Sequence, residues 1–357
     1  MKISYFILFF SLLPFSVFAD EWNFDINGQI QSFYGYSDVD KHNNVIGKGY
    51  IDSSINYSFN ENTTLGLYFN IMGGINQELE DYNQGRWGEE VYGVFESQYG
   101  QFMIGQVYNV ASLFHNGVNL VGALGSNNDV VDFISNPNWV QSSKNTKFAT
   151  LNSTDINTDG VALKFNYISP EFYGSAIGFS YIPESYNRRG LINKHANYSK
   201  DDGFVGAIYS DYDFGLFSTQ TSIGYAQFHD NDKELSYSLK LSRGNWSLGG
   251  GFRKTYIDGK DKVKQSENLL LNYDGYREGI AWNIGVDYEL GPFSSSLNYF
   301  ESQSEQHQNS DKIIAFSNQY RFNKHIDFYV AIARVNFISE DDCKKGYTVV
   351  SGLGVNF

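Results

Sequence analysis

The sequence is poor in cysteine, proline and charge. Its single cysteine, Cys343, excludes an intrachain disulfide and a cysteine metal cluster. Only 18% of the 357 residues are charged and five are proline, while 17% are aromatic and 35 are glycine. So many aromatic rings exclude a disordered chain, and abundant glycine with little proline is typical of strands joined by tight turns. The formal net charge of −14 argues against nucleic acid as a partner, because a phosphate backbone recruits basic surfaces.

Residues 1–19 have the features of a secretory signal peptide. Lys2 precedes an apolar run that ends at Ala19, with small residues at positions −3 and −1 of a cleavage site. Cleavage after Ala19 would remove Lys2 and take the formal net charge from −14 to −15. An uncleaved membrane anchor is the alternative, although the run is short and Pro14 interrupts it. No later stretch approaches the roughly 18 apolar residues of a spanning helix, so residues 20–357 are expected to form one domain.

Apolar and polar residues alternate with a period of two in several segments. In residues 280–290, for example, Ile280, Trp282 and Ile284 lie on one face and Ala281, Asn283 and Gly285 on the other, and residues 161–167, 235–242 and 347–357 repeat the pattern. The segments are often about ten residues long, which is the length of a membrane-crossing strand. Aromatic residues gather near their ends, as at a bilayer interface. A soluble β-sandwich is the alternative, but its strands would be shorter and its second face more charged.

The connections between these segments are alternately short and long. The short ones fall at 60–62, 98–100, 170–174, 213–215, 243–245, 291–292 and 323–325, and the long ones at 38–48, 73–88, 108–159, 183–202, 230–233, 258–276, 302–311 and 338–346. Outer-membrane barrels have short periplasmic turns and long outer loops. The sequence therefore predicts an all-β fold, a transmembrane antiparallel β-barrel of about 16 strands in the outer membrane, with both termini in the periplasm.

The two faces of such strands have different surroundings. The apolar face meets hydrocarbon, so the face rich in serine, asparagine, glutamine and glycine lines the lumen. A dry core of those residues would leave buried polar groups unpaired, at about 1–3 kcal/mol each. The lumen is therefore expected to hold water, and about 16 strands make it wide enough for a channel. This predicts passive diffusion of small hydrophilic solutes and ions.

The connection at 108–159 is by far the longest, and it is rich in small and apolar residues. A loop that folds into the lumen, with one side packed on the wall, would have this composition. We therefore expect it to narrow the pore, with the carboxylates of Asp129 and Asp132 facing passing solutes. An external lid or an adhesive loop is the alternative.

Three short motifs resemble the general Gram-negative trimeric porins. They are residues 100–106 before the long loop, residues 166–174 after it, with a Tyr-x-Ser-Pro-x-Phe turn, and the C-terminal Val-Asn-Phe. The resemblance implies a 16-stranded barrel, a homotrimer and a third loop that constricts the pore. It also implies that Phe357 belongs to the aromatic signature read by the barrel assembly machinery.

The constriction of that family is acidic on the loop and rich in arginine on the facing wall. Here Gln106 stands where the resemblance would place an arginine, and the wall position Asn166 is also neutral. The residues predicted to face the lumen and to supply a reduced basic cluster are Lys164, Lys240, Arg253 and Arg321. The excess of acidic residues predicts a preference for cations. Alternatively, the acids lie in outer loops, where they bind divalent cations together with lipopolysaccharide of the outer membrane or keep the loops solvated.

We find no signature of an enzyme, a cofactor site or a metal site. The six histidines lie mostly in predicted loops without metal-ligand spacing, and there is no Gly-x-Ser-x-Gly motif. An outer-membrane protease or phospholipase is therefore a weak alternative. A channel specific for a sugar or an organic ion stays open, because Phe33, Tyr50 and Tyr68 could stack on a ring if they point inward. A structural or adhesin barrel also stays open.

Overall fold

The computed structural model describes residues 22–75, 90–118, 124, 130, 133–138, 150–183, 202–228, 233–256, 279–304, 309–339 and 342–357. Most of them lie in sixteen β-strands. These are β1 (Trp22–Ser37), β2 (His42–Asn60), β3 (Thr63–Ile75), β4 (Glu90–Ser97), β5 (Gly100–Gln106), β6 (Leu163–Ile168), β7 (Ser175–Ile182), β8 (Gly203–Asp213), β9 (Ser218–Gln227), β10 (Lys233–Arg243), β11 (Trp246–Tyr256), β12 (Gly279–Leu290), β13 (Phe293–Gln303), β14 (Ser310–Asn323), β15 (Ile326–Ile338) and β16 (Cys343–Asn356).

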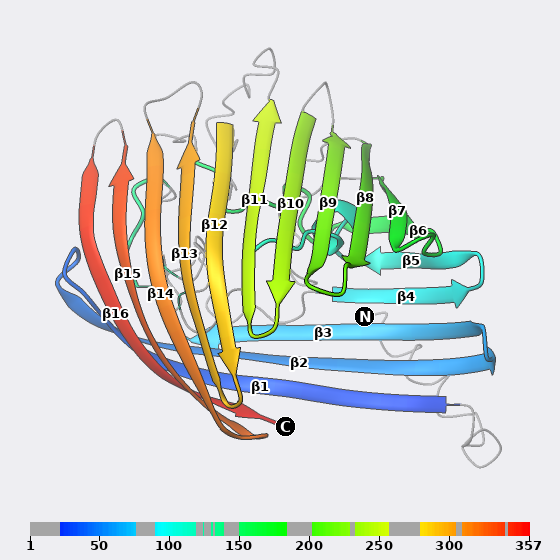
Figure 1. The fold of residues 1–357 in the computed structure, drawn as a ribbon, viewed down its shortest axis with the longest axis horizontal. Helices are drawn as coiled ribbons and strands as arrows, with labels where there is room; N and C mark the ends of the chain where they lie inside the picture. Colours follow the sequence, from blue (N-terminus) through cyan, green and yellow to red (C-terminus); the bar gives the residue numbers. More distant parts are fainter. Residues whose placement is uncertain are drawn as a thin grey trace, which may run out of the picture.

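The strands form a closed barrel. Each strand pairs antiparallel with the next, and β1 pairs with β16, so that Phe33 lies opposite Gly352. In Figure 1, β8 to β16 stand side by side and β1 to β5 cross the other side of the barrel. Because the first strand pairs with the last, no strand edge is left open. The backbone N–H and C=O groups are therefore hydrogen-bonded within the sheet, as lipid requires. The predicted 16-strand transmembrane barrel is confirmed.

All seven short turns fall where the sequence predicts them. The turn between β10 and β11, for example, passes through Gly244 at a φ of 56°, a left-handed conformation that glycine adopts without strain. Two of the predicted long loops are wrong in extent. β2 begins at His42 and β16 at Cys343, so pairs such as Ser37 with His42 and Ile338 with Cys343 continue the ladder. The backbone hydrogen bonds between strands persist in water. The strands therefore continue through polar residues beyond the apolar belt.

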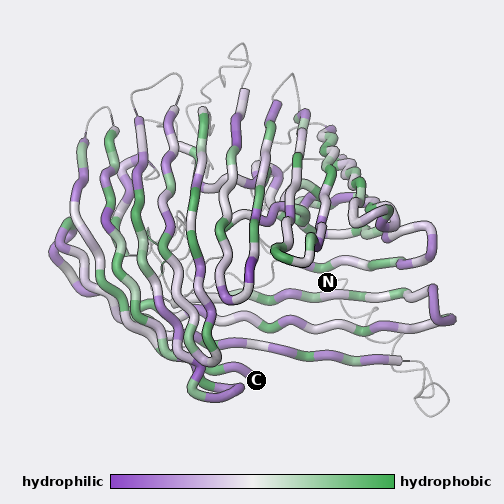
Figure 2. Tube along the Cα trace, in the orientation of Figure 1, coloured by the Kyte–Doolittle hydropathy of each residue, from purple (hydrophilic) through white to green (hydrophobic). Residues whose placement is uncertain are grey.

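The two faces of the strands differ as expected. On β15, Phe328, Val330 and Ile332 are 46%, 55% and 46% exposed, whereas the alternate residues Tyr329 and Ala331 are buried. Figure 2 shows the same alternation of hydrophobic and hydrophilic residues along neighbouring strands. The exposed apolar side chains form the surface that meets acyl chains, and the opposite rows face the lumen.

A short helix, α2 (Val110–Leu113), follows β5. Within the described residues, no helix has the length and apolar character needed to cross a bilayer.

Candidate functional site

The segment after β5 enters the barrel and packs on its inner wall. Asn109 begins α2 by accepting a hydrogen bond from the Ser112 amide. The helix lies against the inward faces of β7 to β9, where the wall residues are small. A Cβ atom at Gly178 would lie 2.7 Å from the Cβ of Val110, and one at Gly224 would lie 2.6 Å from that of Ala111. Glycine at these two positions makes room for the loop.

A second part of the loop packs on the opposite wall. The Phe133 ring occupies the space that a side chain at Gly35 of β1 would need. Loop residues Leu124, Val130, Phe133 and Ile134 share one buried apolar cluster with wall residues that include Phe33, Ala331, Ala333 and Phe337. The loop therefore contacts the β7–β9 wall at one place and the β15–β1 wall at another. The predicted inward fold of the third loop is confirmed.

Polar contacts fix the loop near the outer ends of the strands. The Ser135 amide donates to Asp40 at 2.9 Å, and Lys344 of β16 pairs with the same carboxylate at 3.0 Å. Burial alone would raise the pKa of Asp40, but the bonds from Ser135 and Lys344 outweigh it and hold the pKa below its usual value. Further along, Asn138 donates to Asp311 of β14 at 2.7 Å, and the Thr150 hydroxyl also donates to Asp311.

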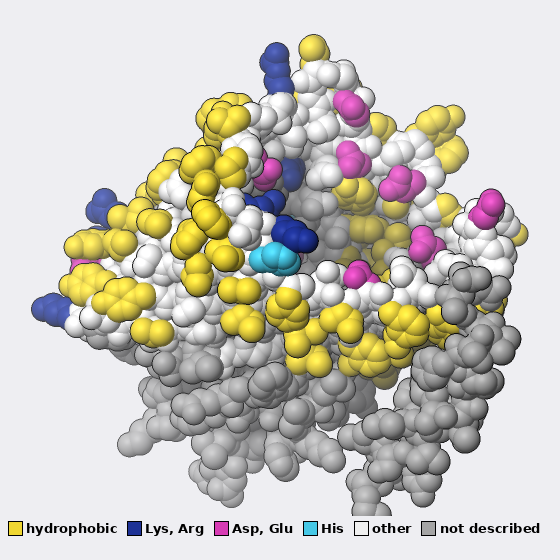
Figure 3. Space-filling view, turned by 90° about the horizontal axis from the view of Figure 1, so that it is seen from below, with side chains coloured by type: hydrophobic (Ala, Val, Ile, Leu, Met, Phe, Trp, Pro, Cys, Tyr) yellow, Lys and Arg dark blue, Asp and Glu magenta, His cyan; other side chains and the backbone are white. Residues whose placement is uncertain are grey.

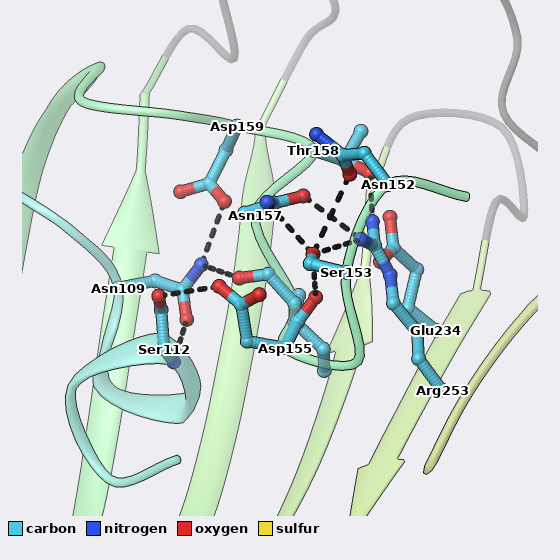
Figure 4. A network of polar contacts seen from close by, with 11 residues as sticks. Asn109, Ser112, Asn152, Ser153, Asp155, Asn157, Thr158, Asp159, Glu234 and Arg253 are labelled. Carbon is cyan, nitrogen blue, oxygen red and sulfur yellow. Dashed lines mark hydrogen bonds and ion pairs between the residues drawn. The ribbon is translucent and has the colours of Figure 1, made fainter. Parts of the chain in front are cut away.

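Where the loop returns, it is held by a buried arginine (Figure 4). Arg253 of β11 and Glu234 of β10 form an ion pair of 2.8 Å, with side chains 0% and 5% exposed. The same guanidinium donates to Asn157 Oδ1 at 2.8 Å and to Thr158 Oγ1 at 2.7 Å. Because one planar group bonds both the wall and the loop, it ties residues 157–158 to the β10–β11 hairpin.

A second buried pair closes the end of the loop. Lys164 of β6 and Asp159 lie 2.9 Å apart with both side chains fully buried. The ammonium also donates to the carbonyls of Gly160 and Ala162, at 2.7 and 3.1 Å. Asp159 in turn accepts from Asn109 at 2.7 Å, which joins the start of the loop to its end. The positive charge of Lys164 is therefore balanced inside the wall.

Two titratable groups of the loop lie beside this network. His115 Nε2 lies 3.0 Å from Thr154 Oγ1, and Asp155 accepts from the Ser112 hydroxyl at 2.8 Å. Burial lowers the pKa of His115. Burial would raise the pKa of Asp155, but the charges of His115 and Arg253 and bonds from serine hydroxyls hold it below its usual value. At low pH both side chains become protonated, and their surroundings in the folded protein disfavour the protonated form.

The wall of β1 to β4 carries acids that the sequence did not lead us to expect, together with Tyr92 beside the expected Tyr68. Two inward rows cross these strands in register, Asp25–Ser54–Tyr68–Tyr92 and Asn27–Asp52–Asn70–Glu90. They border a pocket of about 280 Å³. In Figure 3, most acidic side chains around the central hollow lie on one side, and basic side chains with a histidine lie on the other.

The alternation of apolar and polar residues in β1 indicates that the acidic residue of this strand faces inward. Phe24, Ile26 and Ile30 mark the outward face, so Asp25 and Asn27 between them point inward. The turn at 60–62 then fixes which residues of β2 and β3 share that row. Only Phe33, Tyr50 and Tyr68 of these strands were expected in the lumen, and their acidic neighbours were not.

The model of the Gram-negative porin family matches residues 8–338. The chain belongs to the Gram-negative porins. Both the family and the fold are those of an outer-membrane diffusion channel. No curated protein matches this porin.

Solved porins share the fold at low sequence identity. Salmonella typhi OmpF, in complex with daunomycin, superposes with a TM-score of 0.63 at 14% identity, covering 96% of this chain and 99% of the other. The trimer form of in-vitro folded OmpT from Vibrio cholerae gives 0.58 at 10% identity, covering 95% and 100%. A porin from Rhodopseudomonas blastica, a triple mutant, gives 0.54 at 10% identity, covering 94% and 100%.

The porin structure separates the residues that the sequence suggested for the constriction. Asp129 and Asp132 lie outside the described residues. Lys164 and Arg253 lie in inward rows, but each is buried in an ion pair. Lys240 also lies in an inward row, opposite Gln220 and Gly249.

The two neutral positions have different places in the wall. Asn166 faces inward and donates to the Tyr108 carbonyl at 2.8 Å, so it holds the first residues of the loop. Gln106 lies opposite Leu163, which is 49% exposed on the outward face. Gln106 therefore faces outward, whereas Asn166 faces the lumen.

The aromatic residues suggested for ring stacking also differ. Phe33 faces inward but is buried against Tyr329, with ring centroids 5.7 Å apart. Tyr50 faces inward opposite Gln29. Tyr68 stacks on Tyr92 beside the pocket, which places it among the groups that can meet a solute.

Proposed function

We propose that this outer-membrane channel passes small hydrophilic solutes and ions passively and prefers cations. The observation that carries the preference is the distribution of charge in the described lumen. Asp25, Asp52 and Glu90 lie in two inward rows of one wall, whereas Lys164 and Arg253 are each paired with a carboxylate. The charged residues that border the pocket on this wall are all acidic, and a surface of one sign concentrates ions of the opposite sign beside it. Asp129 and Asp132 remain proposed contributors to the constriction.

The preference is tested by the reversal potential of the purified protein in planar bilayers under a KCl gradient. The wild type is expected to favour potassium over chloride. The double variant Asp52→Asn, Glu90→Gln should reduce the permeability ratio by about two- to fivefold, since it removes two charges from the pathway. Glu61→Gln is the matched control, because Glu61 lies in the turn between β2 and β3. An anion preference of the wild type would refute the proposal.

Single-channel recording also separates the proposal from its rivals. A wide, ohmic conductance supports a diffusion channel, whereas a small conductance blocked by one solute supports a specific channel. A structural or adhesin barrel would give no conductance. An enzyme is not proposed, because the family and the fold are those of a channel.

A homotrimer is proposed from the outer surface. The outward rows of β1 to β4 carry no charged side chain among the described residues; Phe24, Ile51, Leu65 and Phe95 are examples of their apolar members. An uncharged, apolar face suits contact between copies of one chain. Native mass spectrometry in detergent tests the assembly, and a monomer that persists at high protein concentration would contradict it.

Contact with lipopolysaccharide is proposed at the outer ends of β14 to β16. Lys312, Asn336 and Lys345 are in register on the outward face, with Arg334 two residues further down β15. They follow directly on the apolar belt, at the level where lipid phosphates lie. Lipopolysaccharide should raise the melting temperature of the wild type more than that of the variant with glutamine at 312, 334 and 345. Lys240→Gln is the control.

Two further proposals concern the ends of the chain. The Phe357 amide donates to the Gly28 carbonyl, and Gly28 donates back, so Phe357 completes the closure of the barrel. We propose that the barrel assembly machinery reads this residue before closure, which a slower assembly of Phe357→Ala in membranes would support. Cleavage after Ala19 is tested by the mass of the mature protein; residues 1–19 lie outside the described part of the structure.

A further inference from the structure

The pocket on the β1–β4 wall combines three kinds of side chain. Asp52 and Glu90 lie in one inward row, on either side of Asn70, whose amide donates to Asp52. Tyr68 and Tyr92 lie side by side in the neighbouring row, with ring centroids 5.2 Å apart and planes 8° apart. The wall is therefore a mixed surface, with carboxylates and an amide on one row and a stacked aromatic pair on the next.

The carboxylates of Asp52 and Glu90 are too far apart to bind one small ion together. Neighbouring strands lie about 4.8 Å apart, so the backbones at Asp52 and Glu90, two strands apart, are separated by roughly 10 Å. No group of three acidic, histidine or cysteine side chains among the described residues is arranged to hold a metal ion. A ligand that meets both the carboxylates and the rings must be larger than a metal ion.

The charge of the pocket favours a positively charged ligand. The residues that line it include Asp25, Asp52 and Glu90 but no lysine or arginine. The next inward base along the row is Lys164, two strands beyond Tyr92, and its ammonium is bound to Asp159; the next along β2 is Lys48, four residues before Asp52 and outside the pocket lining. The volume of about 280 Å³ accommodates a small organic molecule.

We propose that this pocket is a binding subsite for organic ammonium ions that carry an apolar or aromatic part. The ammonium group lies by Asp52 and Glu90 and is attracted by their charge. The apolar part packs on the Tyr68–Tyr92 pair, where aromatic faces also attract a cation. The inference rests on the proposed cation-preferring channel and names a class of solute that the channel retains on its way through.

The test uses 2-phenylethylammonium as the probe and 2-phenylethanol as its neutral counterpart. Single-channel potassium currents of the wild type should be interrupted by the cation at concentrations at which the alcohol has no effect. Asp52→Asn and Glu90→Gln should each raise the concentration for half block by about three- to tenfold. Tyr92→Leu should do the same, whereas Tyr92→Phe keeps the aromatic face and should retain block.

A matched control removes the same charge elsewhere in the lumen. Asp211 lies in an inward row of β8, where it accepts a hydrogen bond from Gln220 at 2.9 Å. Asp211→Asn should change half block by less than twofold. Equal weakening in Asp211→Asn and Asp52→Asn would overturn the subsite, because it would reveal only a general effect of charge. Block by the alcohol at the same concentration would also overturn it.

Binding measured without current keeps the two proposals distinguishable. Isothermal titration of the detergent-solubilised wild type with 2-phenylethylammonium should give one site per chain, weakened by the same variants. A protein that conducts and prefers potassium but does not bind the probe refutes the subsite and leaves the channel intact. A folded barrel without any conductance refutes the channel instead, whatever the titration gives.

Discussion

The β1–β4 wall and the β6–β11 wall both place charged side chains in inward rows, but those side chains have different partners. Asp52 and Glu90 border the pocket on the first wall. Lys164 and Arg253 on the second wall lie beneath the loop, in ion pairs of 2.9 and 2.8 Å. An inward position is thus not enough to make a charge available to a solute. A charge covered by the loop holds the loop, whereas a charge that lines the pocket is the kind that we propose acts on the solute.

The largest effect is expected from breaking the arginine pair under the loop. Arg253→Met leaves Glu234 buried without its partner and removes the bonds to Asn157 and Thr158. The loss of one member of a buried pair costs about 3–5 kcal/mol of unfolding free energy. Urea unfolding in lipid vesicles measures the change. Replacing both Arg253 and Glu234 by methionine should recover most of it, and an unchanged single variant would show that the comparison of the two walls is wrong.

The next largest effect is expected from steric crowding between the loop and the wall. A Cβ at Gly249 of β11 would collide with the Gly117 carbonyl of the loop, which is backbone and cannot rotate away. Gly249→Ala is expected to cost about 1–3 kcal/mol in the same unfolding measurement. Gly206→Ala is the control, since nothing lies within 4 Å of its Cβ position. Equal costs at the two glycines would mean that the loop does not press on the wall.

A smaller effect should appear with acid. Because the pKa of His115 is lowered in the folded protein, the unfolded chain binds a proton that the folded chain excludes. The contribution of His115 is present above its ordinary pKa of about 6.5 and is lost as the pH falls below that value. The hydrogen-exchange protection factors of residues 109–116 and 150–158, which correct for the intrinsic pH dependence of exchange, should therefore fall between pH 7 and pH 5. His115→Gln should remove most of this dependence, and an identical pH profile in the variant would contradict the assignment.

The smallest effect is expected from a basic residue that no loop covers. Arg321 lies 3.7 Å from Asp327, but its side chain is 63% exposed. Arg321→Gln should lower the unfolding free energy by less than about 0.5 kcal/mol, because water screens the exposed guanidinium and the buried Asp327 keeps a hydrogen bond from Asn356. The difference from Arg253→Met is a direct measure of what the loop adds. A loss as large as that of Arg253→Met would remove the distinction.

The barrel could be predicted because its rules are local. The alternation of Ile280, Trp282 and Ile284 with small or polar residues sets the two faces, and the short turns set the order of the strands. The extent of the outer hairpins could not be predicted, because hydrophobicity ends at the membrane surface while backbone pairing does not. β2 from His42 and β16 from Cys343 are the examples.

The site was harder to predict than the barrel. Lys164 and Arg253 do face inward, as the alternation implies, but their partners depend on where the loop folds. Asp159 is close to Lys164 in sequence, yet only the returning loop brings the two together in a place without water. The pocket on β1 to β4 needs the register of three hairpins, and an error of one residue in any of them would turn its acids toward lipid.

The double contact of the loop with Asp311 also bears on the order of assembly. Thr150 and Asn138 reach this residue of β14 across 161 and 173 positions of the chain. Contacts of such long range form after the local hairpins. These two anchors of the loop can therefore form only once β14 is in place, so the loop takes its final position late in assembly.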